Sequence, residues 1–376
     1  MSDAKQYLLS LLSSTFPVLR QHDFPAYVVG GFVRDWLLGR ETADVDIAVG
    51  GNALNTAKEV ARAVAGRYVL LDETNGVARV VVTRNGQPWY LDFASFTGSI
   101  EDDLARRDFT IDAMAVELSD LVSGSLRLID PFSGEKDLKR RLLRAVSSTI
   151  FEQDAARLLR GVRMAAELGF TIEPETEMLI RRNCGLVKLV SSERLREELV
   201  KMLVLPGSAG LVRYLDKLGL LTQVIPEMEG MKGVKQPKEH YWDVFDHSVE
   251  TVAAVEFLLR ETSWEYGKGE LLAITPWAEN IRQHFDQEVA SGSSRKSLLK
   301  LGALLHDIAK PATKTIDDTG RIRFLGHTKQ GAAMAVTILQ RLRFSSREVR
   351  LVESLVYHHL RPVQMTNDDL PTSRAI

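Results

Sequence analysis

The spacing of apolar residues changes at about Val146, and this change divides the chain. Before that point, short β-branched apolar runs alternate with segments of helical period, which predicts strands alternating with helices. From residue 147 to 239 the apolar residues recur every three or four positions, as in FEQDAARLLRGVR and SSERLREELVKMLV. A Pro-Gly break at Pro206 interrupts them, and the pattern predicts helices alone.

Histidines mark a third region. Seven of the eight lie at or beyond His240, which suggests a separate C-terminal unit with its own chemistry. We therefore expect three parts, covering residues 1–146, 147–239 and 240–376.

The stretch YVVGGFVRDWLLGRETADVDIAV, residues 27–49, combines apolar runs with chemistry-bearing side chains. It predicts a buried strand, a Gly-Gly turn, a short helix over 32–38 and a second strand. Strand side chains alternate between faces, so Asp44 and Asp46 leave the same face. A divalent cation offsets the repulsion of such a pair, and Mg²⁺ carrying a nucleoside triphosphate suits the oxygen ligands. A solvated strand end next to an unliganded turn is the simpler alternative.

Composition narrows the class of protein. With 45% apolar and 26% charged residues, the chain reads as a soluble globular protein. No stretch of about 18 apolar residues and no signal peptide is evident, so we expect no membrane partner and a cytoplasmic location. The single cysteine, Cys184, excludes internal disulfides and thiolate metal clusters. The formal charge of −2 gives no overall sign of nucleic acid, but residues 139–163 hold seven Lys/Arg against Glu152 and Asp154.

Two further stretches could bind a nucleotide. In IEDDLARRDFTIDAMAV, residues 100–116, an Arg-Arg-Asp cluster could hold phosphates and a sugar hydroxyl, or form an exposed salt-bridge network. In FEQDAARLLRGVR, Asp154 and Arg157 are three apart and would be neighbours on one helix. They are either a surface ion pair or a pair that reads a base.

The base-reading interpretation follows from hydrogen-bond direction. Cytosine and adenine each present an amino donor beside a ring-nitrogen acceptor, which matches the carboxylate of Asp154 beside the guanidinium of Arg157. Uracil and guanine reverse that pattern. One helix turn could therefore select C and A without a template.

The ordered motifs GGFVRD with DVD, RRDFTIDAMAV, DPFSGEKDLKRRLLRAV, EQDAARLLRGVRMAAELGF and SSERLREELVK resemble the class II CCA-adding enzymes and bacterial poly(A) polymerases. These belong to the polymerase-β-like nucleotidyltransferases, and the resemblance covers about residues 27–230. It implies an α+β fold class, with a mixed-sheet nucleotidyltransferase head (1–146) and an all-α neck and body (147–239) that reads the base and binds tRNA.

The resemblance also implies roles for individual residues. Asp44 and Asp46 would hold catalytic Mg²⁺, and Asp92 in YLDFASF would be a third catalytic carboxylate, unless it is an ordinary strand-edge aspartate. The implied nucleotide-binding residues are Gly30, Gly31 and Arg34 for the triphosphate, Arg107 and Asp108 for ribose or phosphate, Asp154 and Arg157 for the base, and Arg160 and Arg163 on the same helix.

The sequence departs from the family pattern at two places. Gln153 replaces a glutamate beside the base-reading pair, which we expect to be tolerated because Asp154 and Arg157 carry the contacts. Only residues 94–100 separate the strand from the acidic helix start, where many full CCA-adding relatives have a longer loop. The short segment leaves open an enzyme that adds only CC or only the final A.

Four motifs of the histidine-rich region, FDHSVETV, LGALLHDIAK, FLGHTKQGAA and VYHHLRP, place His247, His306-Asp307, His327 and His358-His359 in order on expected helices. Side chains of this kind could together hold Mn²⁺, Ni²⁺ or Mg²⁺. The motifs resemble the HD phosphohydrolase superfamily, which implies an all-α HD-like domain over residues 240–376. A single helix histidine is more often a core or cap residue. The candidates are His247, His306, Asp307, His327 and His358.

The HD pattern ends with an aspartate on a later helix. Asp368 and Asp369 are the late candidates, and they lie in a turn-like TNDDLP segment. We therefore expect a truncated chain with an incomplete HD site.

The sequence predicts a tRNA nucleotidyltransferase that adds C and/or A to the tRNA 3′ end from CTP and ATP with Mg²⁺ and releases pyrophosphate. The alternatives are a CC-adding or A-adding enzyme, a poly(A) polymerase, or an HD phosphohydrolase whose front half only holds RNA. The sequence leaves the oligomeric state open.

Overall fold

The computed structural model describes residues 3–22, 24–237, 241–290 and 292–361. The chain forms two compact units, one made of residues 1–153 and 168–176 and the other of residues 154–167 and 177–376. The three-part division that the sequence predicts, with boundaries at 147 and 240, stays a prediction.

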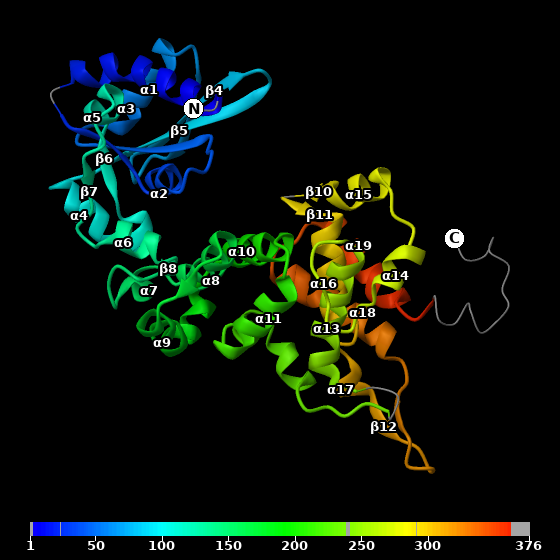
Figure 1. The fold of residues 1–376 in the computed structure, drawn as a ribbon. Helices are drawn as coiled ribbons and strands as arrows, with labels where there is room; N and C mark the ends of the chain where they lie inside the picture. Colours follow the sequence, from blue (N-terminus) through cyan, green and yellow to red (C-terminus); the bar gives the residue numbers. More distant parts are fainter. Residues whose placement is uncertain (1–2, 23, 238–240, 291, 362–376) are drawn as a thin grey trace. The chain divides into compact units, whose positions relative to one another are not determined.

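A seven-stranded mixed sheet organises the first unit (Figure 1), in the order β3-β4-β5-β2-β1-β6-β7. β2 and β5 pair in parallel, and the other neighbours pair antiparallel. The strands are β1 Ala26–Val29, β2 Asp44–Val49, β3 Arg67–Asp72, β4 Val77–Arg84, β5 Gln87–Ser95, β6 Ala115–Glu117 and β7 Leu128–Ile129.

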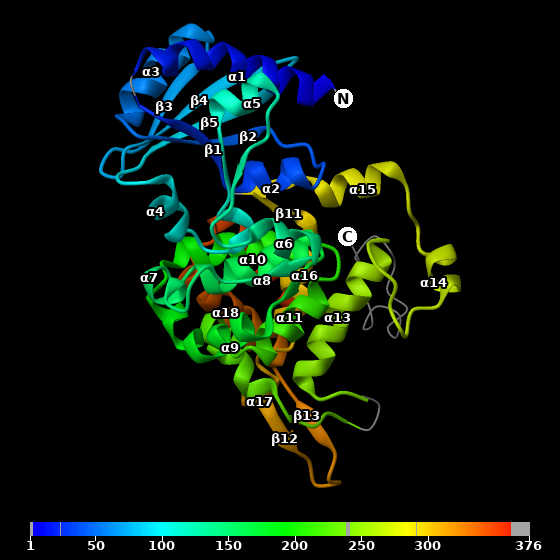
Figure 2. The same cartoon turned by 60° about the vertical axis from the view of Figure 1, so that its left-hand side comes forward.

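Three helices cover one face of this sheet, as Figure 2 shows: α1 Asp3–Gln21, α3 Ala53–Ala63 and α5 Leu118–Ser123. Odd-numbered β2 residues such as Val45 and Ile47 point into this core. Ala48, on the opposite face, packs with residues of α4, Ile100–Ala105. Alternation along β2 therefore separates a core face from the face that carries the aspartates.

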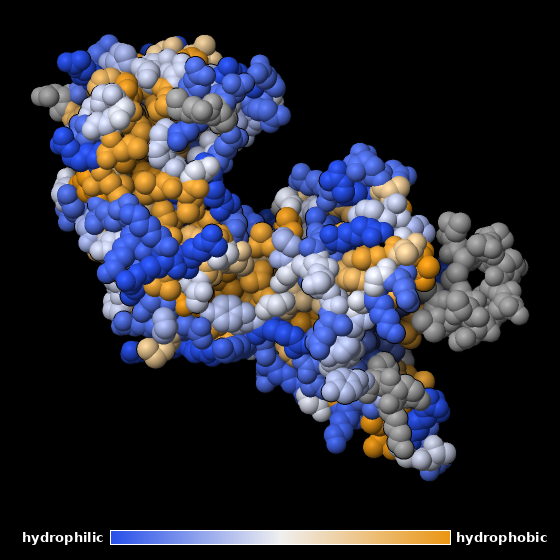
Figure 3. Space-filling view, in the orientation of Figure 1, coloured by the Kyte–Doolittle hydropathy of each residue, from blue (hydrophilic) through white to orange (hydrophobic). Residues whose placement is uncertain are grey.

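The expected short helix is present as α2, Gly31–Leu37, and Gly39 with φ +69° follows it. An apolar groove lined by Trp36, Leu126 and Leu128 lies beside α2. In Figure 3 orange side chains gather where α2, β6 and β7 lie in Figure 1. The remaining elements that lie wholly in this unit are η1 Thr110–Asp112, α6 Gly134–Lys139, β8 Leu142–Leu143, α7 Ile150–Gln153 and β9 Thr171–Ile172.

Helices dominate the rest of the chain, as the sequence predicts. They are α8 Arg157–Leu168, α9 Pro174–Asn183, η2 Cys184–Leu189, α10 Ser192–Val204, α11 Ser208–Lys217, α12 Leu221–Val224, η3 Pro226–Met231, α13 Val244–Leu258, α14 Gly269–Ile274, α15 Glu279–Asp286, α16 Arg295–Leu305, α17 Lys310–Thr313, α18 His327–Arg341 and α19 Ser346–His358. Two small antiparallel ribbons accompany them, β10 Glu288–Ala290 with β11 Ser293–Ser294, and β12 Lys314–Ile316 with β13 Ile322–Phe324.

A buried ion pair joins the body helices to the C-terminal bundle within the second unit. Lys300 on α16 is fully buried, and its Nζ lies 3.0 Å from the Glu256 carboxylate on α13. The same carboxylate accepts the backbone N–H of Ser208 at the start of α11. Because a buried charge needs both a counterion and hydrogen bonds, these contacts hold the three helices together.

Candidate functional site

Three carboxylates lie on one face of neighbouring strands. The parallel register places Asp46 on β2 opposite Asp92 on β5, and Asp44 lies two residues before Asp46. Side chains at matched positions of a parallel pair leave the same face, and Val45 on the other face is 1% exposed. The structure thus places the two aspartates of the DVD motif and the predicted third carboxylate on one face, although the three do not form a group whose oxygens all lie within 4.8 Å of one another.

The Gly-Gly turn lies beside these carboxylates. Gly30 has φ +69°, in a region that residues with a Cβ rarely adopt. A Cβ at Gly30 would lie 2.5 Å from Nη1 of Arg107 and 3.3 Å from Oδ2 of Asp46. The turn therefore allows the Arg107 guanidinium to approach the carboxylate face, while Gly31 begins α2.

Sequence reasoning missed a cation at this site. Arg79 on β4 is the antiparallel partner of Asp92, and its Nε and Nη2 donate to the two Asp92 oxygens at 2.7 Å each. The signal was available in the alternation of VARVVVTR, which places Arg79 on the face opposite buried Ala78 and Val80. Burial raises the pKa of Asp44, an effect that Arg79 opposes and Asp92 reinforces.

The two arginines of this unit that the sequence predicted as nucleotide-binding, Arg34 and Arg107, are held by carboxylates. Arg34 donates from Nη1 to Asp112 at 2.6 Å, and it also bonds both oxygens of Asp35. These two acids raise the pKa of Arg34 against the opposing effect of burial, so the guanidinium stays charged. Arg107 Nη2 lies 3.2 Å from Asp103.

Asp108 is buried, and its oxygens accept hydrogen bonds from the backbone of the chain. Its Oδ1 accepts the N–H of Phe109, and its backbone oxygen accepts the N–H of Val146. These bonds anchor the RRDF segment, and Arg107 stands one residue before the anchored position.

The carboxylate face fits a divalent cation. It offers hard oxygen donors from adjacent strands, which is the donor chemistry that Mg²⁺ prefers. The turn at Gly30 keeps the neighbouring space free of a side chain that would otherwise collide with Arg107 and approach Asp46.

The base-reading candidates do not share one helix, which corrects the sequence expectation. α7 ends at Gln153, and α8 begins at Arg157. Oδ1 of Asp154 accepts the N–H of Ala156 at 3.1 Å, and such a local bond competes with the helix. Asp154 and Arg157 therefore flank a turn.

A further residue holds Asp154. Arg194 on α10 donates to both oxygens of this carboxylate, at 2.9 and 2.7 Å. Burial raises the pKa of Asp154, but the bonds from Arg194 and the amide of Ala156 outweigh it, so the pKa lies below its usual value. Arg194 is the first arginine of RLR within SSERLREEL, and this basic pair was the feature of the sequence that could have pointed to it.

The other two predicted arginines of α8 differ in their surroundings. Arg160 is exposed. Arg163 is largely buried, contacts Glu167, and donates from Nε to Glu198 at 2.6 Å. Arg163 is therefore committed to two carboxylates of its own unit.

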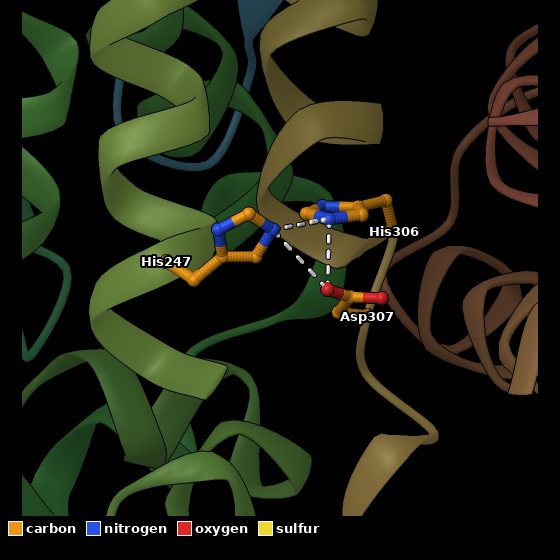
Figure 4. A group of neighbouring side chains, drawn as sticks. All are labelled: His247, His306 and Asp307. Atoms are coloured by element: carbon orange, nitrogen blue, oxygen red, sulfur yellow. Dashed lines mark hydrogen bonds and ion pairs between the residues drawn. The ribbon is translucent and has the colours of Figure 1, made fainter. Parts of the chain in front are cut away.

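A second cluster surrounds Asp307 in the C-terminal bundle (Figure 4). Oδ2 of this buried aspartate lies 2.9 Å from Nε2 of His306 and 3.4 Å from Nε2 of His247 on α13. Figure 4 shows the two rings turned toward each other and toward Asp307. The sequence suggested that the His-Asp pair lies within a helix. In the structure α16 ends at Leu305, and the pair follows that end.

The other oxygen of Asp307 faces a second pair of histidines. Oδ1 lies 3.5 Å from Nε2 of His327 and 3.7 Å from Nε2 of His359. The structure does not bring the predicted His358 here: it is exposed and stacks edge-on with Tyr357. Successive residues at a helix end point about 100° apart, so only one of two adjacent histidines can face Asp307.

The rings are oriented as metal ligands usually are. Nδ1 of His306, His327 and His359 each lies 2.7 Å from a backbone oxygen, so donation from Nδ1 leaves Nε2 with its lone pair toward Asp307. Burial lowers the pKa of His327 and of His359, which favours the neutral ring.

Two groups of ligand atoms therefore share Asp307, one with His247 and His306 and the other with His327 and His359. Nε2 of His247 lies 3.2 Å from Nε2 of His306, within hydrogen-bond distance, and both nitrogens lie near Oδ2 of Asp307. Lys310 adds a charge, with Nζ 2.7 Å from Oδ2. A cavity of about 640 Å³ opens onto this cluster. Asp368 and Asp369 lie outside the described residues.

Among the residues that the structure describes, no helix is both long and apolar enough to cross a membrane.

Family models match three consecutive parts of the chain. The poly(A) polymerase head domain matches residues 26–144, the probable RNA- and SrmB-binding site of polymerase A matches 169–231, and the HD domain matches 244–375. These matches agree with the order of functions that the motifs predict.

Curated relatives cover nearly the whole chain. An A-adding tRNA nucleotidyltransferase of Deinococcus radiodurans is 35% identical over 93% of this chain and 72% of its own length. A CC-adding tRNA nucleotidyltransferase of Thermus thermophilus is 34% identical over 94% of this chain and 72% of its own length. A solved structure described as a tRNA-processing enzyme complex has a TM-score of 0.67 at 23% identity, covering 96% of this chain and 83% of that one, and this likeness supports the fold. The chain belongs to the family of tRNA nucleotidyltransferases with a poly(A) polymerase head domain, and it is a nucleotidyltransferase.

Proposed function

We propose that this enzyme adds part of the CCA sequence to the 3′ end of tRNA in the cytoplasm, using CTP or ATP with Mg²⁺ and releasing pyrophosphate. The observation that carries the proposal is the carboxylate face formed by Asp44, Asp46 and Asp92 beside the Gly30 turn. The similarity to A-adding and CC-adding enzymes supports tRNA as the acceptor.

The link between β5 and α4 favours partial addition. Four residues, Phe96 to Ser99, connect the strand to the helix. Phe96 is buried, and Ser99 forms a capping box with Asp102, so the link is fixed at both ends. A short anchored segment leaves little freedom to change specificity between C and A, and both relatives named above add only part of the triplet.

In the head, Asp44 and Asp46 would hold the divalent cation, which supplies charge stabilisation at the α-phosphate when it is bound. Arg107, held beside Asp46 by the Gly30 turn, would orient the triphosphate. The tRNA 3′-hydroxyl loses its proton to water as its oxygen bonds to the α-phosphorus, in line with the breaking bond to the leaving pyrophosphate. Asp92 orders the face through its pair with Arg79.

In the second unit, Asp154 and Arg157 would select the base. The carboxylate accepts from the amino group of C or A, and the guanidinium donates to the ring nitrogen. Arg194 fixes the carboxylate from the other side.

The test supplies purified enzyme with tRNAs that end before CCA, after C and after CC, with each nucleotide alone. An enzyme that adds only part of CCA extends only some of these tRNAs. Asp46→Ala should abolish extension but leave tRNA binding largely intact, because phosphate contacts supply most of the affinity. Addition of all three nucleotides would overturn partial addition, long A tails would indicate a poly(A) polymerase, and active Asp46→Ala would overturn the site.

A second candidate function has its own observation. The two ligand groups sharing Asp307 would suit one or two divalent ions, of Mn²⁺, Ni²⁺ or Mg²⁺, in a phosphohydrolase. A bound ion would polarise a phosphoester, and Lys310 at the cavity would hold a phosphate oxygen. Hydrolysis of phosphomonoesters and cyclic phosphodiesters with added metal tests this activity.

A further inference from the structure

Two contacts hold the Arg79 side chain at the carboxylate face of the head, one with Asp92 and one with Tyr90. Its planar guanidinium forms a two-point fork with Asp92, at 2.7 Å for each bond. The same guanidinium lies over the ring of Tyr90, with Cζ 4.6 Å from the ring centroid. A cation that is stacked and doubly bonded has one favoured position.

The charges of the face show what this position does. Asp46 and Asp92 are paired across β2 and β5, and Asp44 lies two residues before Asp46. Two arginines approach these carboxylates, Arg107 at the Gly30 turn beside Asp46 and Arg79 through its bonds to Asp92. The side chains of Arg79 and Asp92 are 33% and 21% exposed, so water does not fully screen the pair. Arg79 is therefore a counterion for one of the three carboxylates.

A counterion inside a metal site has two effects. It lowers the attraction of the face for a bare divalent cation, since the two positive charges repel. It also holds the Asp92 carboxylate at a fixed angle, which a metal or a substrate hydroxyl would otherwise have to impose. A nucleoside triphosphate brings its own negative charge and offsets the first effect.

We propose that Arg79 is a positioning residue of the nucleotidyl-transfer site: it keeps Asp92 paired and makes the head take up its divalent cation together with the nucleoside triphosphate. This inference rests on the proposed function, in which Asp44 and Asp46 hold that cation. Arg79 acts through Asp92 and need not touch the substrate.

The experiment measures Mn²⁺ binding to the full chain without nucleotide, by electron paramagnetic resonance, and transfer kinetics with Mg²⁺. Arg79→Met should bind Mn²⁺ at the head at least about fivefold more tightly, because one repelling charge is gone. Its kcat should fall, while the Mg²⁺ concentration for half-maximal rate falls as well.

Two further variants separate charge from geometry. Arg79→Lys keeps the charge but loses the fork, so Mn²⁺ affinity should stay near that of the parent while kcat falls. Arg84→Met makes the same charge change further along β4, where the guanidinium lies over Tyr7, and should leave both quantities unchanged.

The Asp46→Ala variant gives the baseline, because the cluster around Asp307 can also bind Mn²⁺. The Mn²⁺ binding that disappears in Asp46→Ala is the head component. If Asp46→Ala loses this component but Arg79→Met binds Mn²⁺ with unaltered affinity, only this inference is overturned. Unaltered Mn²⁺ binding in Asp46→Ala would overturn the metal assignment of the proposed function. Circular dichroism of each variant confirms that the fold is kept.

Discussion

The carboxylate of Asp154 and the guanidinium of Arg194 form a two-point ion pair, with Nη1 2.9 Å from Oδ1 and Nη2 2.7 Å from Oδ2. The pair spans 40 residues of sequence and joins the turn before α8 to the first turns of α10. Its geometry determines which way the Asp154 oxygens face, and in the proposed function these oxygens select the base.

The first prediction concerns that choice. Asp154→Ala should relax discrimination against UTP more than it slows transfer, and Arg157→Ala should weaken the use of both CTP and ATP. Each mismatched buried group typically costs about 1–3 kcal/mol, which corresponds to roughly tenfold to hundredfold selectivity per contact. The measurement is kcat/KM for all four nucleotides on a tRNA lacking its 3′ end.

Arg194→Met should share part of the Asp154→Ala effect, because the freed carboxylate can rotate. Arg182→Met, an exposed arginine on α9, is the control and should leave the nucleotide ratios unchanged. If neither Asp154→Ala nor Arg157→Ala alters the ratios, these residues are surface charges and the base is read elsewhere.

The second prediction is a pH dependence of stability. The pKa of Asp154 is lower in the folded chain than its ordinary value of about 3.9. A lowered carboxylate pKa contributes stability that is present above the unfolded pKa and is lost as pH falls through the folded pKa. The free-energy difference between the parent and Asp154→Asn should therefore be largest near neutral pH and shrink below about pH 4.

Urea unfolding at pH 7, 5, 4 and 3 measures this difference. Because Arg194 is half exposed, the effect should be no more than about 1 kcal/mol. A difference that grows as the pH falls would contradict the assigned direction.

The third prediction concerns the Gly30 turn. Gly30→Ala introduces a Cβ 2.5 Å from Nη1 of Arg107, so the guanidinium must shift from its present position at the turn. We expect kcat to fall by about tenfold to hundredfold, as misplacement of about 1 Å in a positioned group can do. Single-turnover transfer rates give the measurement.

Gly39→Ala is the matched control. Gly39 has the same φ of +69°, and a Cβ there meets nothing within 4 Å. Gly30 also has ψ −136°, outside the left-handed helical region, so Gly30→Ala should lose more stability than Gly39→Ala. Transfer rates are therefore compared under conditions where both variants are fully folded, and only Gly30→Ala should then be slower. Equal activities would mean that Arg107 has no positioned role.

The fourth prediction separates two adjacent histidines. His359→Ala should weaken divalent metal binding by the cluster around Asp307, because Nε2 of His359 lies 3.7 Å from Oδ1. His358→Ala should leave it unchanged, since that side chain is exposed. Isothermal titration with Mn²⁺ or Ni²⁺ measures both.

Transfer of nucleotides by the head should be unaffected in either variant, which is the internal control. Equal metal loss in both variants, or loss in His358→Ala alone, would contradict the placement of the two rings.

Local patterns were enough to predict much of this protein. The alternation in DVDIAV predicted that Asp44 and Asp46 share a face, because strand side chains repeat every second residue. The period of residues 147–239 predicted helices, and the ordered motifs predicted the family. The first two predictions depend on neighbours in the sequence, because a single strand or helix already determines them, whereas the family followed from the order of motifs along the chain.

Other features needed chain segments that are distant in sequence. Arg79 meets Asp92 through the register of β4 and β5, and Arg194 on α10 meets Asp154 in the turn before α8. His359 rather than His358 faces Asp307 because the rotation of α19 is set by its contacts with α16 and α18. A sequence pattern predicts which side chains lie on one face of a strand or helix. Strand register and helix rotation depend on the complete core, so only the tertiary structure decided which charged side chains contact one another.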